Sequence, residues 1–183
     1  MKENNYHELI VGFHEKSSPN DSFLGTVLPE LLTGLHSQII MARLTMPINT
    51  IRCIHITFPA KTEFEAGFFH WVDQTERLAA GLDCRIKYHG HIDTMTLIQK
   101  HLKENKSRTR AEYFETDGGN DLKRLSKIIR EDHLLIVVSA RRGSISFRPS
   151  HDHIFVQLQR DYPNTSVLLI YPNGYKVEGG ETH

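Results

Sequence analysis

The stretch HLLIVVSARRGSIS, residues 133–146, decides the fold: an apolar run passes directly into a loop rich in serine, arginine and glycine. The run at 134–138 is short, continuous and rich in Ile and Val, which predicts a strand buried on both faces. Strands of this kind are typical of parallel sheets that helices cover on both sides. We therefore expect an α/β fold.

Outward from this stretch, short apolar runs alternate with segments of helical spacing. Apolar residues recur three and four positions apart over 67–82, 92–105 and 121–130, and a further helix opens at 150–152 and continues to 162. The pattern predicts a doubly wound, mostly parallel sheet. The expected strands are 7–13, 38–44, 52–58, 84–89, 110–116, 133–140 and 166–171.

Residues 9–44 and 136–171 share one plan, offset by 127 positions. Each unit has an apolar strand, a polar serine-rich loop, a helix and a second apolar strand. The inward helix positions correspond, with Val27, Leu28, Leu31 and Leu35 in the first unit and Ile154, Phe155, Leu158 and Tyr162 in the second. The alternative is that any two β-α-β units look alike.

The repeat predicts an uneven division of the chain. Residues 51–173 hold five strands and form a complete domain, whereas 1–47 hold only the last β-α-β unit of a similar, preceding domain. Residues 47–50 are the link, and 174–183 form a flexible tail. We therefore expect the sequence to be a piece of a longer protein in which Met1 is not the natural start.

Composition excludes several classes of protein. Lys plus Arg and Asp plus Glu are 22 each, and a nucleic-acid binder normally carries a basic surplus. Hydrophobic residues at 39% exclude a disordered chain, and the apolar runs are far too short to cross a bilayer. Without a secretion signal or a disulfide framework, the chain is expected in the cytoplasm.

The five-stranded domain with its Ser/Gly loop resembles the universal stress protein family. Nucleotide-binding members of that family carry Gly-x2-Gly-x9-Gly-Ser/Thr after the fourth strand. The first unit keeps Gly12, Gly25 and Thr26, has Glu15 at the second glycine, and adds His14 in the same loop. The first strand of that domain is absent from the chain, so turn glycines without a ligand are the alternative.

The second unit departs from the family signature at all four positions. They read Ser139, Arg142, Asp152 and His153. Binding members also usually place an aspartate just past the first strand, and Lys61 stands there in this sequence.

A closer resemblance covers nearly the whole chain. Residues 134–147, 67–72 and 41–44 are similar to the cytoplasmic C-terminal region of sodium/proton antiporters of the Bacteroides group. In those proteins a membrane transporter precedes two tandem stress-protein-like domains. The resemblance implies a non-enzymatic regulatory domain on the cytoplasmic side of the inner membrane, with the antiporter domain of the same chain as partner. A homodimer is expected as well, because the strand at 7–13 would be left without its native neighbours at an exposed sheet edge.

In the universal stress protein family, the last strands of two domains pair antiparallel, either across a dimer or between tandem domains. An unpaired apolar edge invites aggregation, so pairing also removes a physical liability. We expect 38–44 to run antiparallel to 166–171, giving one seven-stranded sheet with 7–13 at its far edge.

The loop after residue 138 holds the candidate binding residues. The carboxyl edge of an open parallel sheet is where ligands bind, and guanidinium groups suit phosphate oxygens. The candidates are Ser139, Arg141, Arg142, Gly143, Ser144 and Ser146, with Lys61 expected on the same edge. ATP, AMP or a cyclic dinucleotide would be the ligand. The alternative is that both arginines pair with Asp132 or Asp152, or contact a neighbouring domain.

Metal and catalytic motifs give weaker indications. The pairs His89/His91 and His151/His153 lack further ligands at recognisable spacing, and His55 alternates along a strand as a packed residue would. We therefore expect no metal site and no enzyme. Buried, inert thiols are the expectation for Cys53 and Cys84, and a solvated loop is the expectation for Glu63 and Glu65.

Overall fold

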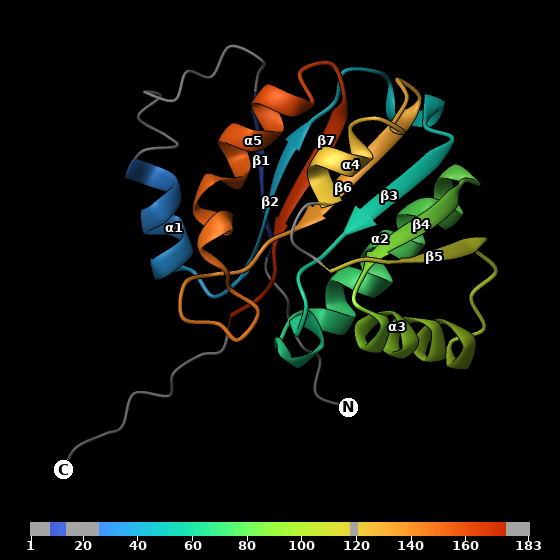
Figure 1. Ribbon diagram of the computed structural model, residues 1–183, viewed down its shortest axis with the longest axis horizontal. Helices are drawn as coiled ribbons and strands as arrows, with labels where there is room; N and C mark the ends of the chain where they lie inside the picture. Colours follow the sequence, from blue (N-terminus) through green and yellow to red (C-terminus); the bar gives the residue numbers. More distant parts are fainter. Residues whose placement is uncertain (1–7, 14–25, 118–120, 175–183) are drawn as a thin grey trace.

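The computed structural model describes residues 8–13, 26–117 and 121–174. Seven strands form one sheet in the order β1-β2-β7-β6-β3-β4-β5 (Figure 1). Every neighbouring pair is parallel except β2 and β7. The strands are β1 Glu8–Gly12, β2 Gln38–Arg43, β3 Cys53–Thr57, β4 Arg85–Gly90, β5 Ala111–Glu115, β6 His133–Val138 and β7 Ser166–Tyr171.

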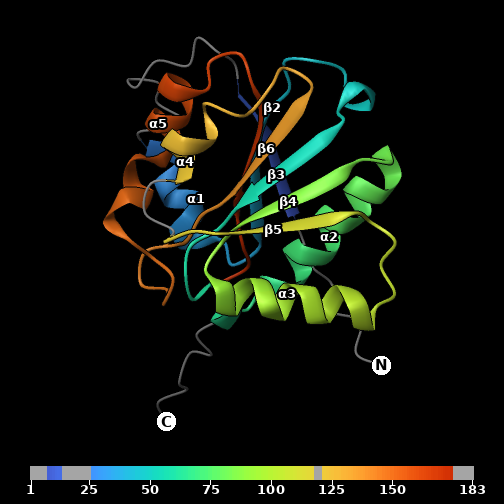
Figure 2. The same cartoon turned by 45° about the vertical axis from the view of Figure 1, so that its right-hand side comes forward.

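Helices cover both faces of the sheet, as Figures 1 and 2 show together. Helices α2 and α3 pack on one face, and α1, α4 and α5 pack on the other. The fold is therefore doubly wound α/β, as the alternation of apolar segments predicts. The helices are α1 Leu28–Gly34, α2 Phe68–Leu82, α3 Ile92–Glu104, α4 Asp121–Leu125 and α5 Ile154–Asp161, with short 3-10 helices η2 Ile48–Thr50, η3 Thr62–Phe64 and η4 Pro149–His153.

The antiparallel pairing of β2 with β7 is confirmed, and β1 lies at the far edge of a seven-stranded sheet as expected. Met41 pairs with Leu169, and Ala42 pairs with Leu168. Under the offset of 127, Met41 corresponds to Leu168 and Ala42 to Leu169. The two β-α-β units therefore meet about an approximate twofold axis at equivalent residues, as two identical subunits would.

The two units share their hydrophobic cores. Ile40 packs in the core beneath α2 and α3, whereas Ile39 and Met41 pack with α4 and α5 on the other face. Alternate residues of a strand point to opposite faces, so β2 supplies both cores and joins the first unit tightly to the rest.

Two predicted helices differ from the structure at particular residues. Val27 and Leu35 were expected to face inward, yet they are 39% and 38% exposed, because α1 is only two turns long and both lie beyond its ends. Helix α4 ends at Leu125 and gives way to a turn, which leaves Ile128 51% exposed.

Candidate functional site

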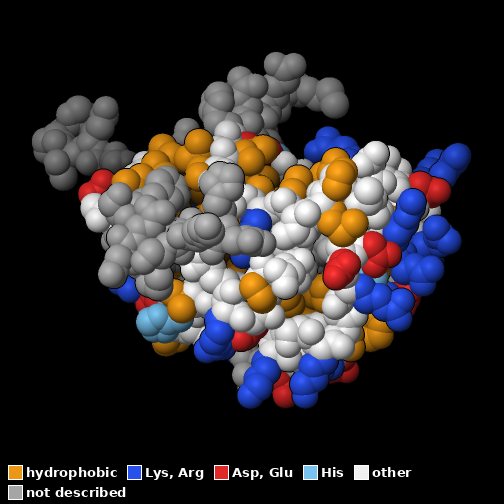
Figure 3. All heavy atoms as spheres, turned by 90° about the horizontal axis from the view of Figure 1, so that it is seen from above, with side chains coloured by type: hydrophobic (Ala, Val, Ile, Leu, Met, Phe, Trp, Pro, Cys, Tyr) orange, Lys and Arg blue, Asp and Glu red, His pale blue; other side chains and the backbone are white. Residues whose placement is uncertain are grey.

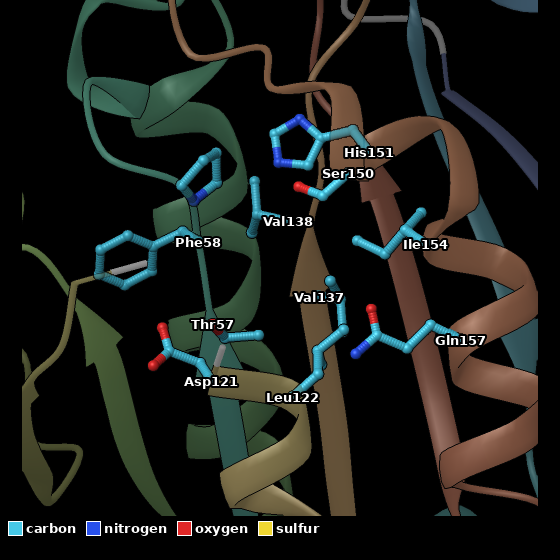
Figure 4. A pocket seen from close by; sticks show the side chains of 11 residues that line it. Thr57, Phe58, Asp121, Leu122, Val137, Val138, Ser150, His151, Ile154 and Gln157 are labelled. Carbon is cyan, nitrogen blue, oxygen red and sulfur yellow. The ribbon is translucent and has the colours of Figure 1, made fainter. Parts of the chain in front are cut away.

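Two hollows lie at the carboxyl edge of the sheet. The smaller one sits between the ends of β3 and β6, where the winding of the chain reverses and where open α/β sheets bind ligands. Side chains converge on it from β3, β6, α4, η4 and α5, among them Thr57, Asp121, His151 and Gln157 (Figure 4). Its volume of about 60 Å³ is far below the roughly 300–1,000 Å³ typical of small-molecule pockets.

The larger hollow is a groove of about 750 Å³, which is large enough for a nucleotide-sized ligand. Helix α1 of the first unit forms one wall, and the loop after β6, η4 and α5 form the other. The residues that follow β7 also line it. The groove therefore runs along the seam between the two β-α-β units. Its apolar lining comes from Leu28, Pro29, Leu32, Ala140, Phe147, Phe155, Val156, Tyr171 and Pro172.

Six of the seven predicted ligand-binding residues line this groove: Ser139, Arg141, Arg142, Gly143, Ser144 and Ser146. The seventh, Lys61, follows β3 at the same edge but is exposed and lines neither hollow. Its backbone is left-handed, with φ of 69°, and it directly precedes η3.

The partial nucleotide motif of the first unit is only partly described. Gly12 is the last residue of β1, and a side chain added there would meet no atom within 4 Å, so packing does not require glycine. Thr26 is exposed just before α1 and does not line the groove. His14 and Gly25 lie outside the described residues.

Arg141 is committed to the seam rather than to the open groove. Its guanidinium donates hydrogen bonds to the carbonyl oxygens of Leu32 and Leu35 at the end of α1, at 2.7 and 2.6 Å. It also donates to the carbonyls of Ser37 at 2.6 Å and Pro172 at 3.1 Å. Burial lowers the pKa of Arg141. The predicted phosphate fork is thus a clamp between the two units, which matches the alternative of a contact with a neighbouring domain.

Arg142 pairs with a carboxylate, which was the other alternative for the two arginines. Its guanidinium forms a two-pronged ion pair with Asp152, at 2.9 and 2.8 Å. The Arg142 side chain is 78% exposed at the mouth of the groove. An exposed pair of this kind exchanges partners at small cost, so Arg142 can still meet an anion there.

Backbone conformation and hydrogen bonds hold the rest of the loop. Gly143 has φ of 86°, a conformation that favours glycine. Ser144 donates its hydroxyl to the carbonyl of Arg141, and Ser146 donates both its amide N–H and its hydroxyl to the carboxylate of Glu65. Glu65, expected in a solvated loop, instead lines the groove and holds the loop after β6 through these two hydrogen bonds.

Two features of the structure escaped the sequence argument. Asn173 lines the groove, and its Oδ1 has no hydrogen-bond partner among the described residues. Away from the groove, Cys53, His55 and His133 come together from β3 and β6. Their sequence positions fit no metal motif, and only the strand alternation 53/55 signals that two of them share a face.

A scan against protein-family models finds no match for this chain, and a search of curated proteins also finds none. Within the described part of the chain, no helix combines the length and apolar character needed to cross a membrane.

Proposed function

We propose that this chain is a non-enzymatic regulatory module that binds a small ligand in the groove along its seam. The observation that carries the proposal is the groove itself, about 750 Å³ in volume and walled by both β-α-β units. A ligand there touches α1 on one side and the loop after β6 on the other. Binding would therefore favour one relative position of the two units, which is the differential contact that regulation requires.

The charges around the groove favour a ligand with few negative charges. Arg141 is engaged by four carbonyl oxygens, Arg142 is paired with Asp152, and Glu65 adds a further carboxylate. A triphosphate would find no surplus of cations among these lining residues. AMP or a cyclic dinucleotide fits better than ATP, since a base can occupy the apolar walls while one phosphate replaces Asp152 on Arg142.

The attachment to a sodium/proton antiporter remains a proposal that rests on the resemblance of residues 134–147, 67–72 and 41–44. In such a protein, a ligand-dependent change at the seam would reach the transporter through the chain that precedes the first unit. Deleting this region from the full-length transporter should then alter its response to pH or to the ion.

Calorimetric titration with AMP, cyclic di-AMP and ATP tests the binding proposal. We expect heat with AMP or cyclic di-AMP, and less with ATP. Val156→Trp should weaken binding about tenfold or more, equivalent to about 1.4 kcal/mol, because Val156 lines the groove and is 48% exposed there.

Ile92→Trp is the matched control, since Ile92 is 45% exposed on α3 and lies outside the groove. Absence of heat with all three compounds at millimolar concentration, or equal binding by both tryptophan variants, would overturn the proposal. The rival function, a structural dimerisation module without a ligand, predicts that result.

A further inference from the structure

Three histidines form a hydrogen-bonded row across the middle of the sheet. Nδ1 of His55 lies 3.1 Å from Nε2 of His89, and Nε2 of His55 lies 3.2 Å from Nδ1 of His133. His55 and His89 are 1% and 2% exposed. They lie on the face opposite α2 and α3, because His55 alternates with Ile54 and Ile56, which pack in the core beneath those helices.

Cys53 joins one end of this row. It pairs across the strands with His133 and shares its face of β3 with His55. The sulfur of Cys53 and the ring nitrogens of His55 and His133 all lie within 4.8 Å of one another. Cys53 is 4% exposed, whereas the side chain of His133 keeps 16% exposure and opens the group toward solvent.

We propose that Cys53, His55 and His133 are three ligands of a zinc site. Zinc prefers thiolate and imidazole ligands in a tetrahedron, with Zn–N distances of about 2.0–2.1 Å. Two nitrogens on one tetrahedral zinc are then about 3.3–3.4 Å apart, close to the 3.2 Å between His55 and His133. Because no fourth ligating side chain among the described residues joins the group, one position is left for water. The site departs from the sequence expectation of no metal.

A histidine that binds zinc usually donates its other ring N–H to a hydrogen-bond acceptor, which fixes the orientation of the ring, and the row provides such an acceptor for His55. The backbone N–H of Arg130 donates to Nδ1 of His133, so this nitrogen is an acceptor and the shared proton belongs to Nε2 of His55. When His55 binds zinc through Nε2, its proton moves to Nδ1 and points at His89. His89 then carries its own proton on Nδ1, an atom that has no partner among the described residues.

The other ring nitrogen of His133 lies near a carboxylate. Its Nε2, the ring nitrogen on the far side from the site, lies 3.7 Å from the carboxylate of Asp132. Zinc on Nδ1 would displace the N–H of Arg130, an exposed residue whose amide can bond to water instead. The only proton that leaves the protein is that of the Cys53 thiol, one for each zinc ion bound.

The protonation states of the proposed ligands partly favour and partly oppose zinc binding. Burial lowers the pKa of His55 to about 3, so its imidazole is neutral and offers a lone pair. Burial raises the pKa of Cys53 to about 11, so zinc must displace the thiol proton. Lys87 and Arg85 on β4 stand near Cys53, but both lie 3.7 Å from the carboxylate of Glu112. Their repulsion toward a cation is thereby partly offset. Lys and Arg side chains also gather along one side of the molecule in Figure 3.

Titration of the EDTA-treated protein with cobalt(II), followed by competition with zinc, tests the proposal. We expect one tightly bound ion per chain, tetrahedral cobalt absorption and a thiolate-to-cobalt charge-transfer band. Cys53→Ser should abolish the charge-transfer band and weaken binding at least tenfold, and His133→Asn should weaken binding similarly while keeping the band.

Cys84→Ser is the matched control, because Cys84 is equally buried but packs on the face of α2 and α3. If Cys53→Ser fails to fold, the partly exposed His133 still gives the decisive variant. The proposal is overturned if cobalt gives no saturable spectrum, or if binding persists unchanged in the Cys53→Ser/His133→Asn double variant, as adventitious binding by other histidines would.

Discussion

Replacing Arg141 with alanine removes the guanidinium that ties α1 to the loop after β6. Four backbone carbonyls lose their donor at once: those of Leu32, Leu35, Ser37 and Pro172. The Leu35 bond is exposed, so water can replace the donor there, whereas the other three bonds are partly buried.

The magnitude follows from these three bonds. Each partly buried carbonyl left without a partner costs about 1 kcal/mol, so the total is about 3 kcal/mol. Releasing the charge of Arg141 from its partly buried position returns some of this, and we expect a net loss of about 2–3 kcal/mol. For a chain of 183 residues, each kcal/mol lowers Tm by about 2–4 °C, which gives a shift of about 4–12 °C.

Thermal denaturation measures the loss of stability, and hydrogen exchange shows which elements it loosens. Arg141→Lys should recover less than half of the loss, because an ammonium cannot reach four carbonyls as a planar fork does. Exchange should increase first in α1 and β2. Arg142→Ala is the control and should leave Tm unchanged, since its pair with Asp152 is solvent-exposed. A loss below about 0.5 kcal/mol for Arg141→Ala would refute the clamp.

Gly90→Ala should lower the free energy of unfolding by about 1–3 kcal/mol in urea denaturation, because the added Cβ would lie 2.1 Å from the ring of Phe58. Gly12→Ala is the control and should leave the free energy of unfolding unchanged, because its Cβ would meet no atom within 4 Å. Burial lowers the pKa of His151, and the Nδ1 of its ring accepts a hydrogen bond from the backbone N–H of Arg148. Below about pH 6.5, the folded state therefore binds fewer protons at this residue than the unfolded state does. His151→Gln should therefore make the loss of stability on acidification from about pH 6.5 to 5 less steep, and an unchanged slope would contradict this.

The fold was predictable because each strand carries its own signal. The strand core at 134–138 has no polar residue and can only be buried. The pairing of β2 with β7 was expected from the family resemblance, and the need to cover two apolar edges supported it. The ends of the short helices were not predictable. Apolar spacing through Ile128 and Leu35 suggests longer helices than the sheet can cover, so these residues remain exposed.

The location of the candidate site could be predicted from the sequence, but the roles of its residues could not. The sequence puts Arg141 and Arg142 at the carboxyl edge, and six predicted residues do line the groove there. Whether an arginine faces a ligand or a carbonyl depends on which main-chain groups the tertiary structure brings within reach. The end of α1, more than a hundred positions away in the sequence, decides this for Arg141.

The position of Arg141 links the stability of the seam to the proposed regulation. Its four carbonyl partners belong to α1, to the turn before β2 and to the residue after β7, so it spans the same two walls that enclose the groove. A ligand that only filled existing space would leave those bonds intact and could not move one unit against the other. Regulation therefore requires a ligand that bears on α1 strongly enough to shift it relative to this guanidinium. A shift that breaks these bonds would cost as much as Arg141→Ala, about 2–3 kcal/mol, so differential binding must supply that amount, which corresponds to an affinity ratio between the two states of about 30- to 150-fold.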